Sequence, residues 1–184
     1  MRVLATLMLG TALVAAGGAV DGLCSRAVAA VPAGTPVTMG AADRAAAETL
    51  VDFLQKTRIQ ANLPALNRQP VLDEAAAARA LALASGTQTP DLRQGLLRAF
   101  YVPMQDIALE ARASGDPGQP LAIWQDTAAT VGALSTPGMT DVGVARVANP
   151  TPNGPNDAYI WVVVLAQPLR TPAESPDSPR WSPK

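Results

Sequence analysis

The sequence predicts an α+β domain in which helical segments come first and strands follow. Between about Ala41 and Leu134, apolar residues recur at the three- and four-residue spacing of helices. From Asp141 onward the spacing changes, and residues 141–147 and 158–165 are predicted to be strands, the second apolar on both faces. Hydrophobic residues make up 48% of the 184-residue chain, which is enough to build one core.

Two helices are predicted in the first part of the domain. The first runs from about Ala41 to near Asn62, because Pro64 cannot continue it and Asn tolerates the left-handed cap position. Its predicted inward face consists of Ala47, Leu50, Val51, Leu54 and Arg58. The second helix begins at Pro70, which suits a first helical turn, and ends at Gly86. Its predicted inward row consists of Leu72, Ala76, Arg79, Ala80 and Leu83.

The middle of the chain is predicted to contain two more helices around an irregular stretch. A short helix starts at Thr89, its N-cap, and runs to about Phe100. Residues 101–118 are predicted to be irregular because prolines interrupt them. A fourth helix covers about 120–134, and residues 149–157 form the loop between the two strands. The core-facing residues of the fourth helix are predicted to be Leu121, Trp124, Ala128, Val131 and Leu134.

The amino terminus has the layout of a secretory signal peptide over residues 1–29. Arg2 precedes an uncharged stretch, Val3–Val20, and small residues then form an A-x-A pattern at Ala27–Ala29. The alternative is an uncleaved membrane anchor, because 18 uncharged residues are near the lower limit for crossing a bilayer. The predicted location is therefore secreted or in the cell envelope, with membrane contact only through this segment if it stays attached.

Three further segments complete the predicted organisation. Residues 30–43 are a flexible lead-in whose end overlaps the start of the first helix, and residues 44–168 are the folded domain. Residues 169–184 form a tail that is rich in proline and is expected to be disordered.

The residue inventory excludes several kinds of chemistry. The chain has no histidine, so a Ser-His-Asp triad is impossible and the commonest metal ligand is missing. Its one cysteine, Cys24, would leave with a cleaved signal peptide. We therefore expect no catalytic residues, no metal site and no cofactor. The formal net charge of −1 gives no electrostatic reason to expect nucleic acid as a partner.

Three stretches, in order, resemble the CAP superfamily (cysteine-rich secretory proteins, antigen 5 and pathogenesis-related proteins), and in particular its bacterial SCP-like branch. Arg58, followed by Asn62-Leu-Pro-Ala-Leu and Pro70-Val-Leu, resembles the family pattern R…GLPPL…dPxL. The second stretch is similar to WxxSxxHxxxLLxPxFxxVGVG and consists of Trp124, Thr127, Leu134, Pro137 and Asp141-Val-Gly-Val. Tyr159-Ile-Trp161-Val-Val-Val-Leu resembles the closing strand. The resemblance implies a three-layer α-β-α sandwich, with about four helices around a small antiparallel sheet.

The same resemblance implies a cleft whose ligand-type residues have been replaced. Arg79 and Thr130 stand where the family often has histidines, and Gln105 stands where the "GEN-I" segment has its glutamate. Glu110 lies nearby, but a single carboxylate does not make a metal site. The family's metal-dependent activity is therefore not expected here. The predicted binding positions are Arg79, Gln105, Glu110, Thr127 and Thr130.

Arg79 has two possible roles. Its spacing in the second helix points it inward, where it would pair with Glu110 or Asp106 or bind an anionic ligand head group. Alternatively, it lays its stem on the core and keeps its charge in water. Trp124 and Trp161 are expected to be core residues, whereas Trp181 in the tail is either unbound or a short docking element.

These observations predict an exported, non-catalytic module that binds a small apolar ligand or a protein partner through the altered cleft. Two alternatives remain: a metal-independent hydrolase that uses carboxylates, and an envelope interaction protein. Convergence of Arg79, Gln105, Glu110 and Thr130 around an open cleft would favour binding. Two carboxylates about 5–9 Å apart across the cleft would favour the hydrolase, and a filled cleft would favour the interaction protein.

Overall fold

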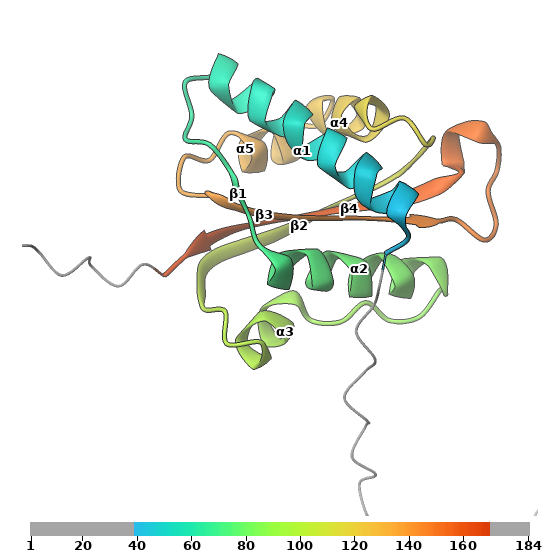
Figure 1. Cartoon of the computed structure of the whole chain (residues 1–184), viewed down its shortest axis with the longest axis horizontal. Coiled ribbons are helices and arrows are strands. Elements are labelled where there is room, and N and C mark those ends of the chain that lie inside the picture. Colours follow the sequence, from blue (N-terminus) through green and yellow to red (C-terminus); the bar gives the residue numbers. More distant parts are fainter. Residues whose placement is uncertain (1–38, 170–184) are drawn as a thin grey trace, which may run out of the picture. The chain divides into compact units, whose positions relative to one another are not determined.

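The computed structural model describes residues 39–169, which form a sheet covered by helices on both faces (Figure 1). Helices α1, α4 and α5 cover one face, and α2 and α3 cover the other. The elements in chain order are α1 (Ala41–Gln60), β1 (Asn67–Arg68), α2 (Pro70–Ala84), α3 (Leu92–Arg98), β2 (Pro103–Ala113), α4 (Gly118–Gln125), α5 (Ala128–Leu134), β3 (Asp141–Ala148), η1 (Pro155–Asp157) and β4 (Tyr159–Pro168). The predicted α+β sandwich is confirmed.

Both termini fall largely outside this description. The predicted signal peptide over residues 1–29 and the lead-in up to residue 38 lie outside the described residues, and so does the predicted tail beyond Leu169. Helix α1 begins at Ala41, where the apolar pattern placed its start.

The sheet is mixed, where a small antiparallel one was expected. Its strand order is β1-β3-β4-β2. Strand β4 pairs antiparallel with both β2 and β3, but the two-residue β1 runs parallel to β3, with Asn67 opposite Asp141. So short a strand leaves no alternating pattern in the sequence, and for that reason β1 was not predicted.

Local sequence signals place the ends of α1 and α2 correctly. Asn62 adopts a left-handed backbone with φ of 55° just after α1, as its tolerance for that conformation predicted. Gly86 does the same after α2, with φ of 64°. Pro70 occupies the first turn of α2, where its missing N–H leaves no hydrogen bond unmade.

The prediction that residues 101–118 are irregular is wrong, because β2 occupies Pro103–Ala113. Leu109, Ala111 and Ala113 are buried, while Glu110 and Arg112 between them are exposed, so the strand alternates as a half-buried strand should. Three of its residues are alanine, which is not a typical strand former. Pro103 stands at its first position, which an edge strand tolerates.

The predicted third and fourth helices also need correction. Helix α3 begins at Leu92 rather than at Thr89, and Asp91 is its N-cap, accepting a hydrogen bond from the Gln94 N–H at 2.8 Å. The single helix predicted over 120–134 is divided into α4 and α5, because Thr127 is extended, with φ of −117°. The described chain therefore has five α-helices, where about four were expected. Past this break the register changes, which leaves the predicted core residues Ala128 and Val131 exposed.

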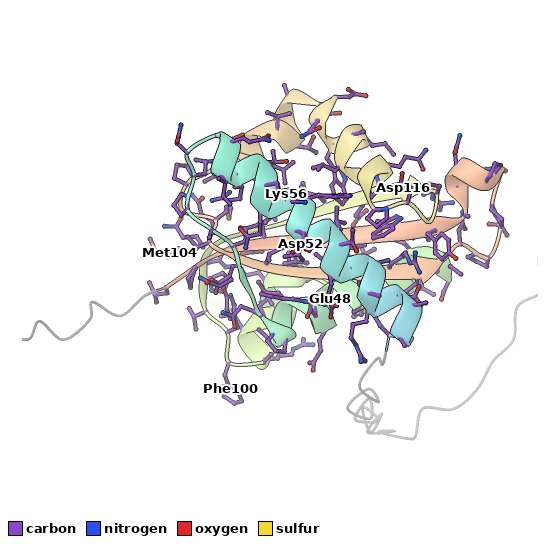
Figure 2. The ribbon with its side chains drawn as sticks, turned by 45° about the horizontal axis from the view of Figure 1, so that its top comes forward. Glu48, Asp52, Lys56, Phe100, Met104 and Asp116 are labelled. Carbon is purple, nitrogen blue, oxygen red and sulfur yellow. The ribbon has the colours of Figure 1, made fainter. Side chains whose placement is uncertain are left out.

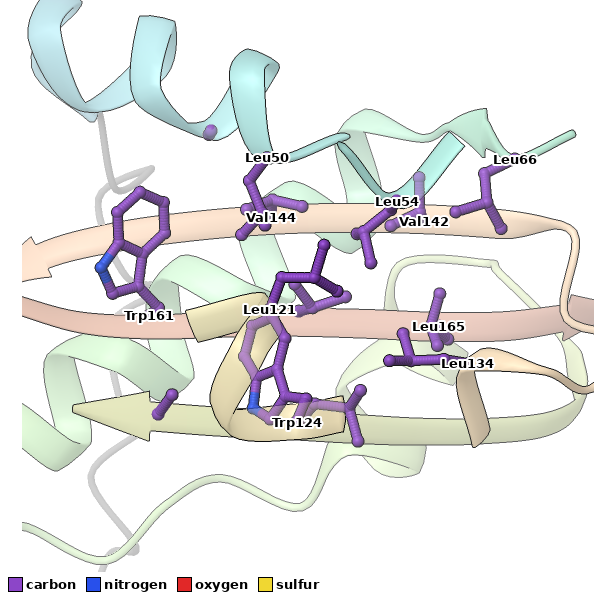
Figure 3. Close-up of a cluster of buried hydrophobic side chains, with 14 of the residues drawn as sticks. Leu50, Leu54, Leu66, Leu121, Trp124, Leu134, Val142, Val144, Trp161 and Leu165 are labelled. Atoms are coloured by element: carbon purple, nitrogen blue, oxygen red, sulfur yellow. The ribbon is translucent and has the colours of Figure 1, made fainter. Parts of the chain in front are cut away.

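Each face of the sheet carries its own apolar core. The core under α1, α4 and α5 includes Trp124 and Trp161, which are 2% and 0% exposed (Figure 3). Their indole N–H groups donate to the main-chain oxygens of Glu110 and Ser114, so neither polar group is left unsatisfied. Both tryptophans are core residues, as predicted. The core on the other face joins α2 and α3 to β4 through small aliphatic side chains.

Helix α2 lies unusually close to β3, and Gly143 makes this possible. A Cβ at position 143 would overlap the Leu72 carbonyl carbon and the Asp73 nitrogen, both of them backbone atoms. Asp73 Oδ1 also accepts a hydrogen bond from the Val144 N–H at 2.8 Å. The start of α2 is thereby fixed against the centre of the sheet, which sets the position of every side chain farther along that helix.

Candidate functional site

The predicted binding residues do not gather in one cleft. Arg79 and Glu110 meet on the face of the sheet covered by α2 and α3. Thr127 and Thr130 lie at the junction of α4 and α5, on the other face. Gln105 is on β2, away from both groups. The sequence did not predict which face of the sheet each of these residues would occupy.

Arg79 pairs with Glu110, one of its two predicted acidic partners. Its Nε donates to Glu110 Oε1, and its Nη1 donates to the Pro90 carbonyl oxygen at 3.3 Å. The side chains of Arg79 and Glu110 are 23% and 33% exposed, so the pair is partly in contact with water. The other candidate partner, Asp106, binds Arg93 instead, with 2.9 Å between Nη1 and Oδ1.

Gln105 belongs to the opposite face of β2. Successive side chains of a strand point to opposite faces, so Gln105 shares a face with Ile107 and Leu109, which pack under α1, α4 and α5. It is also five positions from Glu110, or about 16 Å along an extended strand. Gln105 is exposed and does not form a site with Arg79 and Glu110.

The two threonines have structural roles. Thr127 is the N-cap residue of α5, although its side chain makes no capping hydrogen bond. The Thr130 hydroxyl donates to the Thr127 carbonyl oxygen at 2.8 Å and contacts the Trp124 carbonyl oxygen. It thus satisfies backbone groups at the break between two helices.

A groove between α2 and α3 is the best-formed hollow near Arg79, and the sequence did not predict it. It has a volume of about 210 Å³. From α2 it receives Val71, Ala75 and Ala78, spaced four and three residues apart, beside the inward row of that helix. Alanine at two of these three positions leaves space that larger side chains would fill. This second row of small apolar residues on α2 is the sequence feature from which the groove could have been predicted.

Helix α3 completes the groove with an apolar wall. Leu92, Leu96 and Ala99 line it, together with Gly95, whose missing side chain leaves open space: a Cβ built there would meet no heavy atom within 4 Å. The complete lining is Val71, Glu74, Ala75, Ala78, Arg79, Pro90, Asp91, Leu92, Gly95, Leu96 and Ala99. Most of this surface is aliphatic, as expected for a pocket that holds an apolar group.

Three charged side chains lie along the groove. Asp91 is engaged as the cap of α3, and Arg79 is engaged by Glu110 through Nε. Within residues 39–169 the Nη2 group of Arg79 has no hydrogen-bond partner, so two of its N–H donors remain for an anion. Glu74, the third charge, is exposed.

The described residues offer little else for chemistry. Over 39–169, no group of three or more acidic side chains is placed to hold a metal ion. None of the helices in that range combines the length and apolar character needed to cross a bilayer. A smaller hollow of about 120 Å³ is lined by Glu110 together with Leu83, Ala111, Arg112 and Ile160.

Comparison with solved structures identifies similar folds. The chain is similar to a cysteine-rich secretory protein from Staphylococcus aureus, with a TM-score of 0.59 and 12% identity over 68% of this chain and 39% of that one. It is similar to an outer surface protein from Borrelia burgdorferi, with a TM-score of 0.59 and 15% identity over 68% of this chain and 94% of that one. It is also similar to an extracellular protein from Bacillus anthracis that contains an SCP domain, with a TM-score of 0.56 and 16% identity over 68% of this chain and 41% of that one.

These likenesses concern the fold. The chain spans about two fifths of the Staphylococcus and Bacillus proteins but nearly all of the Borrelia protein. No family model and no curated protein matches the sequence. The three-dimensional arrangement of the described domain is similar to that of these bacterial cysteine-rich secretory and SCP-domain structures, at 12–16% sequence identity.

Proposed function

We propose that this chain, which has the fold of the CAP superfamily, is an exported, non-catalytic module that binds a small apolar ligand between α2 and α3. The supporting observation is the groove itself: an aliphatic hollow of about 210 Å³ beside an arginine with unused donors. Ordinary ligand pockets are about 300–1,000 Å³, so the ligand is short. A cavity on the order of 150 Å³ already holds one benzene ring.

The charge at the groove narrows the ligand class. Arg79 uses Nε for Glu110 and Nη1 for Pro90, which leaves Nη2 for a carboxylate or similar anion at one end of the ligand. The apolar body of the ligand then lies along Ala75, Ala78 and Gly95. We therefore propose a short amphiphile with an aliphatic body and an anionic head group.

This proposal moves the site away from the one expected from the sequence. The sequence predicted that four residues converge around one cleft, and of these only Arg79 and Glu110 are in contact. The other two, Gln105 and Thr130, are therefore not part of the proposed site. A protein partner, the other occupant considered, fits a narrow groove less well than a short chain does.

A carboxylate hydrolase is less well supported by this geometry. Glu74 and Asp91 are the two acidic side chains that line the groove. Asp91 Oδ1 accepts the Gln94 N–H as the cap of α3, so one of the two carboxylates already has a structural role. The proposed absence of catalysis rests on this, together with the lack of histidine in the chain.

Export is supported from two sides. Residues 1–29 have the layout of a signal peptide. The similar structures belong to proteins described as secretory, outer-surface or extracellular. Expression of the full chain with a reporter at its carboxyl end, followed by fractionation, tests export, and retention of the reporter in the cytoplasm would oppose it.

Binding is tested by titrating the protein with octanoate and with octanol, which has the same chain length without the charge. A Gly95→Leu variant places a side chain in the open space of the groove, and Gly132→Leu on α5 is its matched control, since a Cβ there also meets nothing within 4 Å. We expect Gly95→Leu to weaken octanoate binding at least tenfold and Gly132→Leu to leave it unchanged. Equal octanoate binding by the wild type and Gly95→Leu would show that octanoate binds outside this groove. If the wild type does not bind octanoate at all, the proposed ligand class is wrong.

A further inference from the structure

Strand β2 forms one margin of the sheet, where it has a free outer side. It is the last strand in the order β1-β3-β4-β2, and within residues 39–169 it pairs with β4 alone. Figure 3 shows β2 beyond β4 at this margin, and Figure 2 labels Met104, near the start of β2, and Asp116, just past its end. Its 11 residues exceed the usual strand length of about 5–6. A margin of this length is a template on which another strand can pair.

One hydrogen bond at the end of the β3–β4 pair shows which residues of β2 face outward. The Asn149 N–H donates to the Ala158 oxygen at 2.9 Å, so these two residues face each other. The backbone groups of successive residues in a strand point to opposite sides. The even-numbered residues of β4 therefore face β3, and the odd-numbered ones face β2. Through the register of β2 with β4, residues 106, 108, 110 and 112 of β2 face away from the sheet.

Most of these outward backbone groups are unpaired. The Glu110 oxygen accepts the Trp124 indole N–H, which agrees with its outward direction. Within residues 39–169, no hydrogen bond uses the N–H or the carbonyl oxygen of Asp106, Ala108 or Arg112. A carbonyl oxygen has two lone pairs, so that of Glu110 can accept a second hydrogen bond. The outer side of β2 thus presents a row of donors and acceptors from residue 106 to residue 112.

The charged side chains of β2 form a pattern along this row. Asp106, Glu110 and Arg112 have the same parity in the strand, so all three lie on the face that α2 and α3 cover. Glu110 is occupied by Arg79. Asp106 binds Arg93 through Oδ1, and its Oδ2 has no partner within residues 39–169. Arg112 is exposed and has no ion-pair partner in the same range.

This pattern is complementary to itself in one register. When two copies of β2 pair about a two-fold axis perpendicular to the sheet, each face continues into the same face, so even-numbered residues lie opposite even-numbered ones. With the axis at Leu109, Asp106 of each copy lies opposite Arg112 of the other. An axis at Ala108 would place Asp106 opposite Glu110, and an axis at Glu110 would place that residue opposite itself. Like charges directly opposite each other are unfavourable, which selects the axis at Leu109.

The length of overlap supports the same register. An axis at Ala111 also joins unlike charges, but it pairs only residues 109–113 of the two strands, whereas the axis at Leu109 pairs residues 105–113. The helices leave room for this arrangement. On one face, α4 contacts the later half of β2, where Trp124 reaches Glu110. On the other face, α3 contacts its start, where Arg93 donates to the Pro103 oxygen at 3.0 Å. About Leu109, each helix meets the half of the second strand that the same helix of that copy leaves uncovered.

We propose that two copies of the chain associate through their β2 strands, antiparallel about Leu109, to form one continuous sheet. The outward backbone groups pair across the axis, and Arg112 of each copy binds Asp106 of the other. Backbone groups and charges make this contact rather than an apolar core, so the dimer is weak and dissociates on dilution. The stability of a dilute sample is that of the single chain. Neither Asp106 nor Arg112 lines the groove between α2 and α3, so this proposal is independent of ligand binding.

Sedimentation velocity over a wide range of protein concentration tests the proposal, with protein purified from its own host. Ala108→Pro removes an outward N–H, which a strand at the margin of a sheet tolerates, and Ala108→Ser keeps that N–H. Arg112→Glu reverses the charge opposite Asp106, and its matched control is Arg44→Glu, at an exposed arginine of α1. Circular dichroism establishes that each variant is folded.

We expect the wild type, Ala108→Ser and Arg44→Glu to form dimers as concentration rises, and we expect Ala108→Pro and Arg112→Glu to raise the dimer Kd at least tenfold. An equimolar mixture of Arg112→Glu with Asp106→Arg should associate, although each variant alone does not, because unlike charges then lie opposite each other again. If Asp106→Arg does not fold, Ala108→Pro and Arg112→Glu decide the question without it.

Three results would overturn the proposal. A wild type that stays monomeric at every concentration leaves the margin of β2 to a strand of another protein. Association that survives both Ala108→Pro and Arg112→Glu places the contact on a different surface. A mixture of the two folded charge variants that fails to associate contradicts the register about Leu109.

Discussion

Arg58, on α1, donates a hydrogen bond from Nη1 to the main-chain oxygen of Leu134, the last residue of α5, at 2.8 Å. The same guanidinium donates from Nε to the Pro64 oxygen at 2.9 Å, and the residue is 2% exposed. Burial lowers the pKa of Arg58 from its ordinary value. The arginine that opens the first family-like stretch therefore acts as a structural clamp, which joins the loop after α1 to the end of α5.

Removal of this clamp should destabilise the domain. Arg58→Ala leaves the Pro64 and Leu134 carbonyl oxygens without their donor inside the protein, and we expect the free energy of unfolding to fall by about 3 kcal/mol. Arg112→Ala is the control, because Arg112 is exposed on β2, and it should change stability by no more than about 0.5 kcal/mol. Urea unfolding measures both, and equal stability of the two variants would contradict the clamp.

Gly143 should tolerate no side chain. In Gly143→Ala the new Cβ overlaps backbone atoms of Leu72 and Asp73, so α2 must move away from β3. We expect a loss of more than about 3 kcal/mol or failure to fold. Gly132→Ala, where a Cβ meets open space, should instead be neutral or stabilising by up to about 1 kcal/mol. Thermal unfolding of the two variants distinguishes close packing from a general effect of glycine replacement.

The ion pair between Arg79 and Glu110 should contribute little to stability. Both side chains remain partly in water, where solvent screens the attraction. A double-mutant cycle built from Arg79→Gln and Glu110→Gln should therefore give a coupling energy of about 0.5–1 kcal/mol. A coupling above about 2 kcal/mol would mean that the pair is a buried structural element rather than an accessible group at the groove.

Tyr101 should resist ionisation. Burial, together with the hydrogen bond from its hydroxyl to Asp141 Oδ2 at 2.9 Å, raises the pKa of its phenol above the usual range. The native state thus keeps a proton that the unfolded chain loses near pH 10, so this contribution to stability is fully present below about pH 10 and is lost as pH rises further. Tyr101→Phe should flatten the fall in stability between about pH 10 and 12. A fall as steep in Tyr101→Phe as in the wild type would refute this.

Local chemistry made the helices predictable from the sequence. Pro70, Asn62 and Gly86 each act through their own backbone preferences, so the ends of α1 and α2 could be placed without knowledge of the rest of the fold. The strand β4 was also predictable, because a short run of residues that is apolar on both faces is typical of a buried strand in the interior of a sheet.

The candidate site was less predictable because it depends on tertiary arrangement. The alternation of β2 puts Gln105 and Glu110 on opposite faces of the sheet, but its alanines and its proline concealed the strand. The backbone is extended at Thr127, between α4 and α5, and the Thr130 hydroxyl donates a hydrogen bond to the Trp124 carbonyl oxygen at the end of α4. The single predicted helix gave no indication of this structural role. The groove depends on how α3 packs against α2, and a start shifted from Thr89 to Leu92 changes which side chains face it.

Native mass spectrometry of the protein purified from its own host tests most directly whether the groove between α2 and α3 holds a short amphiphile. The wild type and Gly132→Leu should carry an additional small mass that organic solvent releases, and Gly95→Leu should not carry it. If Gly95→Leu carries that mass at the wild-type level, or if the wild type carries none, the groove is not the binding site proposed here.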